Sequence, residues 1–253
     1  MDFRDKVVLV TGAGAGIGRK TALLFAAKGA KVAVNDLRNS AGGLETLRLL
    51  QAQGSTGIFV GGDVSLAPDA ERMVSETVAA LGKIDILINN AGIVLPGRVD
   101  NMSEDDFDMT MRVNVKGAFL VAKYATLEMK KSGGGAIVNI ASVAALKGIT
   151  DRAAYCASKG ALVSLTRAMA ADYLKDNIRV NCVCPGTTLT PSLEDRIQAH
   201  HDPAAMRAEF ISRQPMGRLG RDEEIAQAVL FACCDEAAFM NGSIVSIDGG
   251  ALL

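Results

Sequence analysis

Residues 6–18 read Lys6-Val-Val-Leu-Val-Thr-Gly-Ala-Gly-Ala-Gly-Ile-Gly18 and indicate the fold of the whole chain. The first half is a short, continuously apolar run, which is typical of a parallel β-strand covered by helices on both faces. A glycine-rich loop follows, and a helical pattern then continues to Lys28. Glycines between a strand and a helix let the backbone approach a ligand closely, and the helix N-terminus offers unpaired N–H groups to a phosphate. The spacing of the loop is Thr-Gly-x-x-x-Gly-x-Gly, carried by Thr11, Gly12, Gly16 and Gly18.

Strand and helix patterns alternate along the rest of the chain. Further strands are expected near residues 31–36, 56–62, 84–88, 136–141, 177–184 and 243–247. Helical patterns cover 68–81, 113–131, 155–176 and 222–234, and no repeat or linker interrupts the series. This alternation predicts a single-domain α/β Rossmann fold, with a doubly wound, seven-stranded parallel sheet flanked by helices. We expect residues 1–130 to bind a dinucleotide and residues 131–253 to supply catalysis and substrate binding. The polar segment 191–211, which follows a strand end, is expected to be a substrate lid.

Composition limits the classes of function. The chain has 253 residues, of which 49% are hydrophobic, and a net charge of −1. This balance disfavours nucleic acid or an anionic membrane as a partner. The N-terminus carries no signal-peptide pattern and no apolar run approaches the roughly 18 residues of a membrane span, so a cytoplasmic protein is expected. The five cysteines are expected to be reduced thiols, and Cys182-x-Cys184 has the period of one strand face rather than of a metal site.

The end of the second strand predicts the choice of dinucleotide. Asp36 stands there, and a carboxylate at that place binds two ribose hydroxyls and repels a 2′-phosphate. Arg38 could argue for a phosphate, but we expect it to face solvent. Position 15 in the glycine loop is alanine rather than a basic residue. The sequence therefore favours NAD over NADP as the cofactor.

Residues 142–159 bring together groups that suit alcohol oxidation. Tyr155 and Lys159 are four residues apart, so on a helix they lie one turn apart on the same face. A phenol has a reference pKa of about 10, and an ammonium beside it lowers that pKa by stabilising the phenolate. A tyrosine tuned in this way can take a proton from an alcohol. Ser142 follows a buried strand, where a hydroxyl faces the ligand crevice of an open α/β sheet.

A second helical pattern carries an unexpected amide. Ser103-Glu-Asp-Asp106 has the form of a capping box that opens a helix. Asn114 then lies inside the pattern 113–131, where asparagine is unfavourable unless its side chain serves a purpose.

Together these residues resemble the classical short-chain dehydrogenase/reductase family over essentially the whole length. The matching pieces are Thr11-Gly12-x-x-x-Gly16-x-Gly18, Asp63, Asn89-Asn90-Ala91-Gly92, Asn114, Ser142, Tyr155-x-x-x-Lys159, Pro185-Gly186 and Asp248-Gly249-Gly250. Each piece is weak alone, but the ordered set is very specific. The resemblance implies an NAD-dependent alcohol dehydrogenase acting on a CH–OH group, assembled as a homotetramer.

The resemblance also implies roles for individual residues. Tyr155 would be the general acid/base, Ser142 would orient the substrate oxygen, Lys159 would lower the tyrosine pKa and bind the nicotinamide ribose, and Asn114 would anchor a water in a proton relay. The implied cofactor-binding residues are Gly12, Gly16, Ile17, Gly18, Asp36, Asp63, Val64, Asn90, Tyr155, Lys159, Thr188 and Thr190. Of these, Asp63 and Val64 would flank the adenine and Thr190 would contact the carboxamide. Thr188 departs from the family pattern, which has a branched apolar residue there.

The second half resembles one group within the family, the cytosolic type 2 (R)-3-hydroxybutyrate dehydrogenases. The likeness lies in Cys182-Val-Cys-Pro-Gly-Thr187, Thr190-Pro-Ser-Leu193, Arg196-Ile-Gln-Ala199, Ser212-Arg213-Gln214 and Gly217-Arg218. In that group three arginines hold the substrate carboxylate, and Arg152, Arg196 and Arg213 fill their places here. Guanidinium groups bind carboxylates bidentately and fix their orientation. The implied substrate, bound by Ser142, Tyr155 and these arginines, is a small anionic hydroxy or keto acid.

Other interpretations remain open. Arg152 could cap a loop while Arg196 and Arg213 are solvated helix charges. The substrate could be a 2-keto-3-deoxy sugar acid oxidised at C4, or a neutral polyol, sugar or steroid. The chain could also be a catalytically silent dinucleotide sensor, and a nucleic-acid-binding module is disfavoured by the net charge. No acidic or cysteine partner stands at metal spacing from His200-His201, so no metal is expected.

Overall fold

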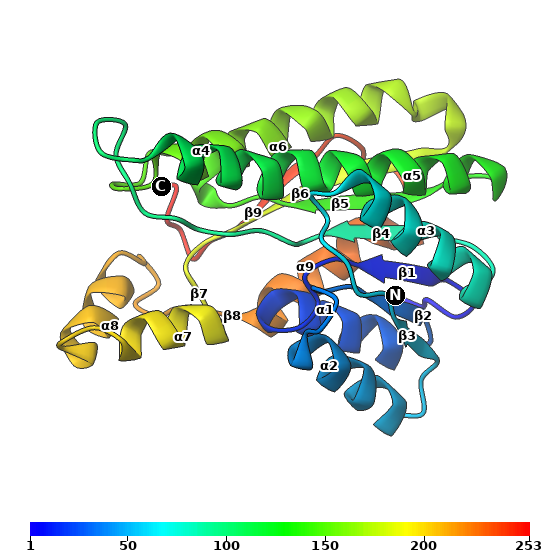
Figure 1. Ribbon diagram of the computed structural model, residues 1–253, viewed down its shortest axis with the longest axis horizontal. Helices are drawn as coiled ribbons and strands as arrows, with labels where there is room; N and C mark the ends of the chain where they lie inside the picture. Colours follow the sequence, from blue (N-terminus) through cyan, green and yellow to red (C-terminus); the bar gives the residue numbers. More distant parts are fainter.

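Seven parallel strands form one sheet in the order β3-β2-β1-β4-β5-β6-β9 (Figure 1). The computed structural model describes all 253 residues. It places the strands at β1 (Val7–Val10), β2 (Lys31–Val34), β3 (Gly57–Phe59), β4 (Ile86–Asn89), β5 (Gly135–Ile140), β6 (Ile178–Pro185) and β9 (Ile244–Ile247). Every pairing is parallel. The predicted single-domain Rossmann fold with a doubly wound, seven-stranded sheet is confirmed.

Helices cover both faces of this sheet. One face carries α1 (Gly16–Ala27), α2 (Ala41–Ala52) and α9 (Asp222–Cys233), and the other carries α3 (Ala67–Leu81), α5 (Ala118–Lys131) and α6 (Ala153–Asp172). Alternate residues of β1 divide between the two cores. Val8 and Val10 pack toward α1 and α9, whereas Val7 and Leu9 pack toward α3 and α5. Because all four are fully buried, the strand is apolar at every position instead of alternating.

The strand order reverses at β1, which pairs with β2 on one side and β4 on the other. The loops that leave the carboxyl ends of β1 and β4 diverge at this point, and in open α/β sheets such a divergence forms the ligand crevice. The glycine-rich loop and Asn90 are thus brought to the same place, although they are far apart in the sequence.

The predicted lid forms two helices, α7 (Pro191–Gln198) and α8 (Pro203–Ser212). Figure 1 shows both standing apart from the two helical layers. Two short parallel strands, β7 (Thr188–Leu189) and β8 (Gly220–Arg221), pair with each other just before α7 and after α8. The sequence did not predict this pair, because two residues are too few to show a strand period.

The helical pattern 113–131 is not a plain α-helix. The chain forms α4 (Glu104–Met111), a π-helical turn over Arg112–Gly117, and then α5 without a break. Ser103 caps α4 by accepting a hydrogen bond from the Asp106 N–H at 3.1 Å. The predicted helix start is therefore confirmed, whereas Asp106 makes no return bond of the kind that defines a capping box.

The cysteines are free thiols, and four of the five are buried. Cys182 and Cys184 lie on one face of β6 with their Sγ atoms 3.9 Å apart, packed against Leu162 and Val163 of α6. Their prediction as core residues is confirmed. No three His, Cys, Asp or Glu side chains are grouped to hold a metal ion. None of the helices combines the length and the apolar character needed to cross a bilayer.

Arg179 closes the end of α9. The last carbonyls of a helix lack partners within it. The Arg179 guanidinium donates to the carbonyls of Ala232, Cys233, Cys234, Ala237 and Met240 at 3.0–3.3 Å. One side chain on β6 thus satisfies the C-terminus of the helix that covers one face of the sheet.

We expect Arg179→Met to lower the free energy of unfolding by about 3 kcal/mol, because several carbonyls lose a charged donor at once. Chemical denaturation measures this change. Arg179→Lys, which keeps a charge and three donors, should lose less. A methionine variant within about 0.5 kcal/mol of the wild type would contradict this role.

Candidate active site

The glycine-rich loop lies against the segment that follows β4. Gly12 has φ +60°, and a Cβ built on it would stand 2.8 Å from the Ala91 Cα, so only glycine fits there. The Asn90 side chain donates to the carbonyls of Thr11 and Gly12 at 2.9 and 3.0 Å. Asn90 therefore holds the loop in place from the neighbouring strand.

Asp36 faces the same loop from the end of β2. A Cβ on Gly14 would stand 1.7 Å from the Asp36 Oδ2, so the carboxylate occupies space that only a glycine leaves free. Asp36 accepts hydrogen bonds from the Leu37 N–H at 2.8 Å and the Ser40 hydroxyl at 3.0 Å. Ala15, the N-cap of α1, offers no side-chain cap to the first N–H groups of that helix. Free N–H groups, a glycine cradle and a fixed carboxylate fit the phosphates and ribose of a dinucleotide.

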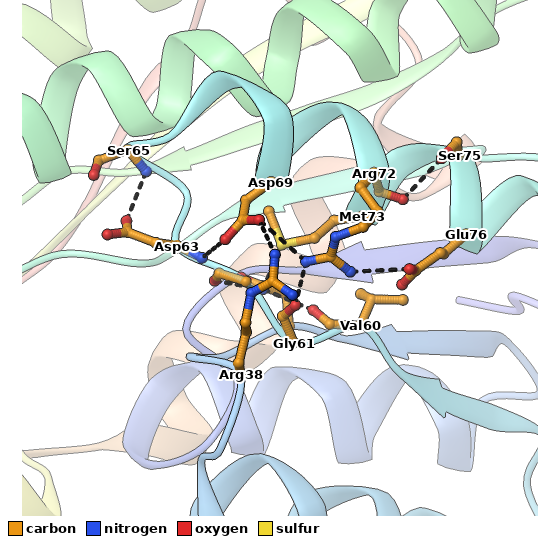
Figure 2. Close-up of polar contacts among 12 residues, drawn as sticks. Arg38, Val60, Gly61, Asp63, Ser65, Asp69, Arg72, Met73, Ser75 and Glu76 are labelled. Atoms are coloured by element: carbon orange, nitrogen blue, oxygen red, sulfur yellow. Dashed lines mark hydrogen bonds and ion pairs between the residues drawn. The ribbon is translucent and has the colours of Figure 1, made fainter.

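Asp63 and Val64 follow β3, the edge strand that pairs with β2. The Asp63 side chain accepts from the Ser65 N–H at 2.8 Å, and its own N–H donates to Asp69 at 2.9 Å. Val64 is buried and packs on Gly117. Arg38, which we expected to face solvent, is 63% exposed but forms an ion pair with Asp69 (Figure 2). It is therefore not a free surface charge.

Tyr155 and Lys159 lie one turn apart on α6, as the spacing predicted. Lys159 is buried; its Nζ lies 5.7 Å from the Tyr155 ring centroid and donates to the Ile140 carbonyl at 2.8 Å. Ser142 follows β5, and its side chain lies near enough to Tyr155 to act on the phenol. The structure thus brings the predicted serine, tyrosine and lysine together. Their implied catalytic roles stay predictions.

Burial raises the pKa of the Tyr155 phenol, whereas the Ser142 side chain and the charges of Arg196 and Arg152 oppose this rise. The Lys159 ammonium donates to the Ile140 carbonyl rather than to the phenol. The lowering of the tyrosine pKa by Lys159 stays a prediction. Burial also lowers the pKa of Lys159 itself to about 8.

The π-helical turn directs Asn114 at the loop after β4. Its Oδ1 accepts from the Ile93 N–H at 2.8 Å, and its Nδ2 donates to the Ile93 carbonyl and the Ser158 hydroxyl, both at 3.0 Å. A Cβ on Gly92 would stand 3.1 Å from the Asn114 Oδ1 and 3.5 Å from the Lys159 Nζ. Asn114 therefore lies beside the lysine and fixes the loop between them, which explains an asparagine within a helical pattern.

Two of the three predicted arginines lie close to Tyr155. Arg152 precedes α6 and Arg196 lies in α7, and the charges of both act on the phenol. Burial and the charge of Arg152 lower the pKa of Arg196, while Tyr155 raises it. The structure does not bring Arg213 to this group: it is exposed at the end of α8 and pairs with Glu209. The expectation of three converging arginines is corrected to two, because the α8 helix places Glu209 one turn before Arg213.

The remaining predicted cofactor contacts lie at the base of the lid. Thr190 accepts from the Leu193 N–H at 3.3 Å and so caps α7. A Cβ on Gly16 would stand 3.2 Å from the Thr190 Cβ, so the segment predicted to be a lid begins against the glycine loop. Thr188 is buried, and its hydroxyl donates to the Gly186 carbonyl at 3.1 Å. Gly18 and Ile17 lie in the first turn of α1.

The sequence did not single out several residues that support the site. Ser40 fixes Asp36, Ser158 holds Asn114, and Asp69 joins Asp63 to Arg38. Ser40 stands just before a helical pattern, and Asp69 lies in the first turn of another, which are places where such residues cap helices or complement their dipoles. Those signals predict helix capping only, and the contacts of Ser158 with Asn114 and of Asp69 with Arg38 join residues far apart in the sequence.

Comparison with known proteins extends these findings. A family model described as "Enoyl-(Acyl carrier protein) reductase" matches residues 12–251. The chain is 54% identical to a Thermotoga maritima protein described as an "Uncharacterized oxidoreductase", with 99% of both chains covered. It is 38% identical to the dehydrogenase/reductase SDR family member 6 of Rattus norvegicus, with 98% of both covered. The crystal structure of levodione reductase superposes with a TM-score of 0.93 at 36% identity, covering 98% of both chains.

We expect Lys159→Met to raise the free energy of unfolding at pH 7 by about 1–2 kcal/mol while removing any turnover. Lowering a lysine pKa from 10.5 to about 8 destabilises the folded protein below pH 8, where the ammonium is charged in both states. The unpaired Ile140 carbonyl offsets part of this gain.

The sign of this effect follows from proton release. Between pH 8 and 10.5 the native lysine loses its proton before the unfolded one, so wild-type stability should rise and approach that of the variant. Denaturation at pH 7 and pH 10 measures both values. A methionine variant that is less stable at pH 7 would contradict the buried charge.

Proposed function

Because the chain belongs to the short-chain dehydrogenase/reductase family, we propose that it is an NAD-dependent dehydrogenase of a small hydroxy acid, of the 3-hydroxybutyrate type. Membership makes it an oxidoreductase that acts on CH–OH groups with a nicotinamide cofactor. The choice of NAD, the acidic substrate and the likeness to type 2 (R)-3-hydroxybutyrate dehydrogenases belong to the proposal.

One observation supports the proposal that the substrate is an acid. Arg152 and Arg196 lie near Tyr155, and neither forms an ion pair with a carboxylate. Other arginines of the lid are paired, Arg207 with Glu194 and Arg213 with Glu209. Two unpaired guanidinium groups that repel each other beside a reactive phenol would be stabilised by an anion between them. A carboxylate on a small substrate would supply that anion and set the distance from its hydroxyl to Tyr155.

Asp36 supports NAD. Its carboxylate is held against Gly14 by two hydrogen bonds, in the place where it would accept hydrogen bonds from both ribose hydroxyls. A 2′-phosphate in that place would meet a negative charge. Two arginines lie nearby, but Arg38 is paired with Asp69, and Arg19 donates to the Gly14 and Gly42 carbonyls and to the Thr46 hydroxyl.

In the proposed reaction Tyr155 removes the proton of the substrate hydroxyl, and Ser142 orients that oxygen. The arginines hold the carboxylate so that the reacting carbon has one orientation. Nicotinamide, when bound, supplies the hydride acceptor. Lys159 supplies a buried positive charge one turn from Tyr155, which favours the phenolate as the proton leaves. Asn114 keeps the loop beside Lys159 fixed during turnover.

We also propose a homotetramer. Large apolar side chains are exposed on α4 and α5, where water would otherwise cover them: Phe107, Phe119 and Leu127 are each about half exposed. The outer faces of α5 and α6 are the proposed interfaces. Light scattering that finds a monomer would exclude this assembly.

The proposal is tested by NAD reduction with three substrates: (R)-3-hydroxybutyrate, a 2-keto-3-deoxy sugar acid and a neutral polyol. We expect turnover of an acid, and the first of the three to be the best. Turnover of the polyol alone would reject the anion site, and tight NADH binding without any turnover would support a silent dinucleotide sensor instead.

Arg196→Ala should then raise KM for the acid by about tenfold or more, as expected for the loss of one charge-assisted bond. Arg213→Ala is the matched control, because this lid arginine is exposed and paired with Glu209. An unchanged KM in the Arg196 variant, or equal effects in both, would remove Arg196 from the substrate site.

Asp36→Ala should narrow the preference for NAD over NADP by about tenfold, because it removes both a ribose acceptor and a repelling charge. The ratio of kcat/KM with the two cofactors measures this preference. An unaltered ratio would show that another residue sets it.

A further inference from the structure

The preference for NAD proposed above rests on Asp36, yet an arginine stands only two residues further along the same loop. A guanidinium beside the adenosine ribose is the group with which dinucleotide-binding folds accommodate a 2′-phosphate. Arg38 is 63% exposed, so it has the freedom to move toward such a ligand. Its position and charge alone would therefore favour NADP. If the protein prefers NAD, another group must keep Arg38 away from the 2′-phosphate.

The opposing group is a buried carboxylate on a different element. Asp69 lies in the first turn of α3, only 10% of its side chain is exposed, and its Oδ1 accepts from the Arg38 Nη2 at 2.5 Å. Figure 2 shows the Asp69 carboxylate facing the guanidinium groups of both Arg38 and Arg72. Because Asp69 is fixed to the sheet edge, the contact draws Arg38 from the loop after β2 toward the start of α3.

Asp69 is itself rigidly held. Its Oδ2 accepts from the Asp63 N–H at 2.9 Å, and Arg72 approaches Oδ1 at 3.4 Å while donating to the Gly61 carbonyl at 2.6 Å. The Asp63 N–H and the two guanidinium groups lower the pKa of Asp69, so it is ionised at neutral pH. Arg38 thus pairs with a preorganised anion, whereas a 2′-phosphate would have to displace that anion.

We propose that Asp69 is a positioning residue for cofactor choice, which keeps Arg38 from binding a 2′-phosphate and so reinforces the selection of NAD by Asp36. Asp36 acts by repulsion at the ribose, and Asp69 acts by occupying the one cation of the loop. This inference rests on the proposed NAD-dependent function.

The test is the ratio of the NADH and NADPH dissociation constants, measured by calorimetry so that no substrate is needed. Asp69→Asn keeps an oxygen for the Asp63 N–H but removes the charge that holds Arg38. We expect NADPH to bind about tenfold more tightly relative to NADH in this variant. Adding Arg38→Ala to Asp69→Asn should return the ratio to the wild-type value.

Two controls separate this role from a structural one. Arg38→Ala in the wild-type background should change the ratio by less than about twofold, because the paired arginine does not reach the phosphate. Glu76→Gln, which removes a partner of Arg72 only, should leave the ratio unchanged. Asp69→Ser, which keeps a hydroxyl acceptor, replaces Asp69→Asn if thermal melts show that the asparagine variant does not fold.

The following results would overturn the proposed role of Asp69. An equal weakening of both cofactors in Asp69→Asn would mean a purely structural role and would overturn it. So would a tenfold loss of NADPH binding in Arg38→Ala alone, since Arg38 would then already bind the phosphate. A wild type that binds neither cofactor would overturn the proposed function as well, whereas normal NADH binding with an unchanged ratio would overturn only the role of Asp69.

Discussion

Burial of the central strands on both faces is the constraint from which the rest of the structure follows. Because β1, β4 and β5 have helices above and below, their side chains are mostly apolar, and polar side chains gather where these strands end. Asp36, Asn90 and Ser142 each follow a strand at the carboxyl edge. The reversal of strand order at β1 separates the loops there, so one packing arrangement produces both the sheet and the crevice that a dinucleotide would fill.

Charge is distributed unevenly around Tyr155. Lys159, Arg152 and Arg196 lie near it, and no carboxylate pairs with any of the three. Elsewhere in the lid each arginine has an acidic partner, as Arg207 and Arg213 show. Burying a lysine without a carboxylate partner destabilises the fold, and here it holds a positive charge one turn from the phenol. The excess positive charge is what a substrate carboxylate would neutralise.

The sequence predicted the strands of the sheet and the grouping of Ser142, Tyr155 and Lys159. Both predictions rest on local patterns. Continuous apolar runs identify buried strands, and a spacing of four on a helix places Tyr155 and Lys159 on one face. The π-helical turn at Asn114 could not be predicted, because it depends on bonds to Ile93, a residue far away in sequence. Arg213 was placed in the site by resemblance alone, and its pairing with Glu209 shows why a matching position does not guarantee a matching contact.

The surroundings of the predicted adenosine site show the same limit of sequence-based prediction. Arg38 is exposed, as the sequence predicts, but no local pattern connects it with Asp69, which is buried on another element. The most direct test of the proposed function compares (R)-3-hydroxybutyrate with its methyl ester as substrates for NAD reduction. The ester lacks the charge that the arginines would bind and adds one methyl group, so we predict a kcat/KM about 100-fold higher for the acid. An ester oxidised as efficiently as the acid would contradict the carboxylate site and with it the proposed substrate.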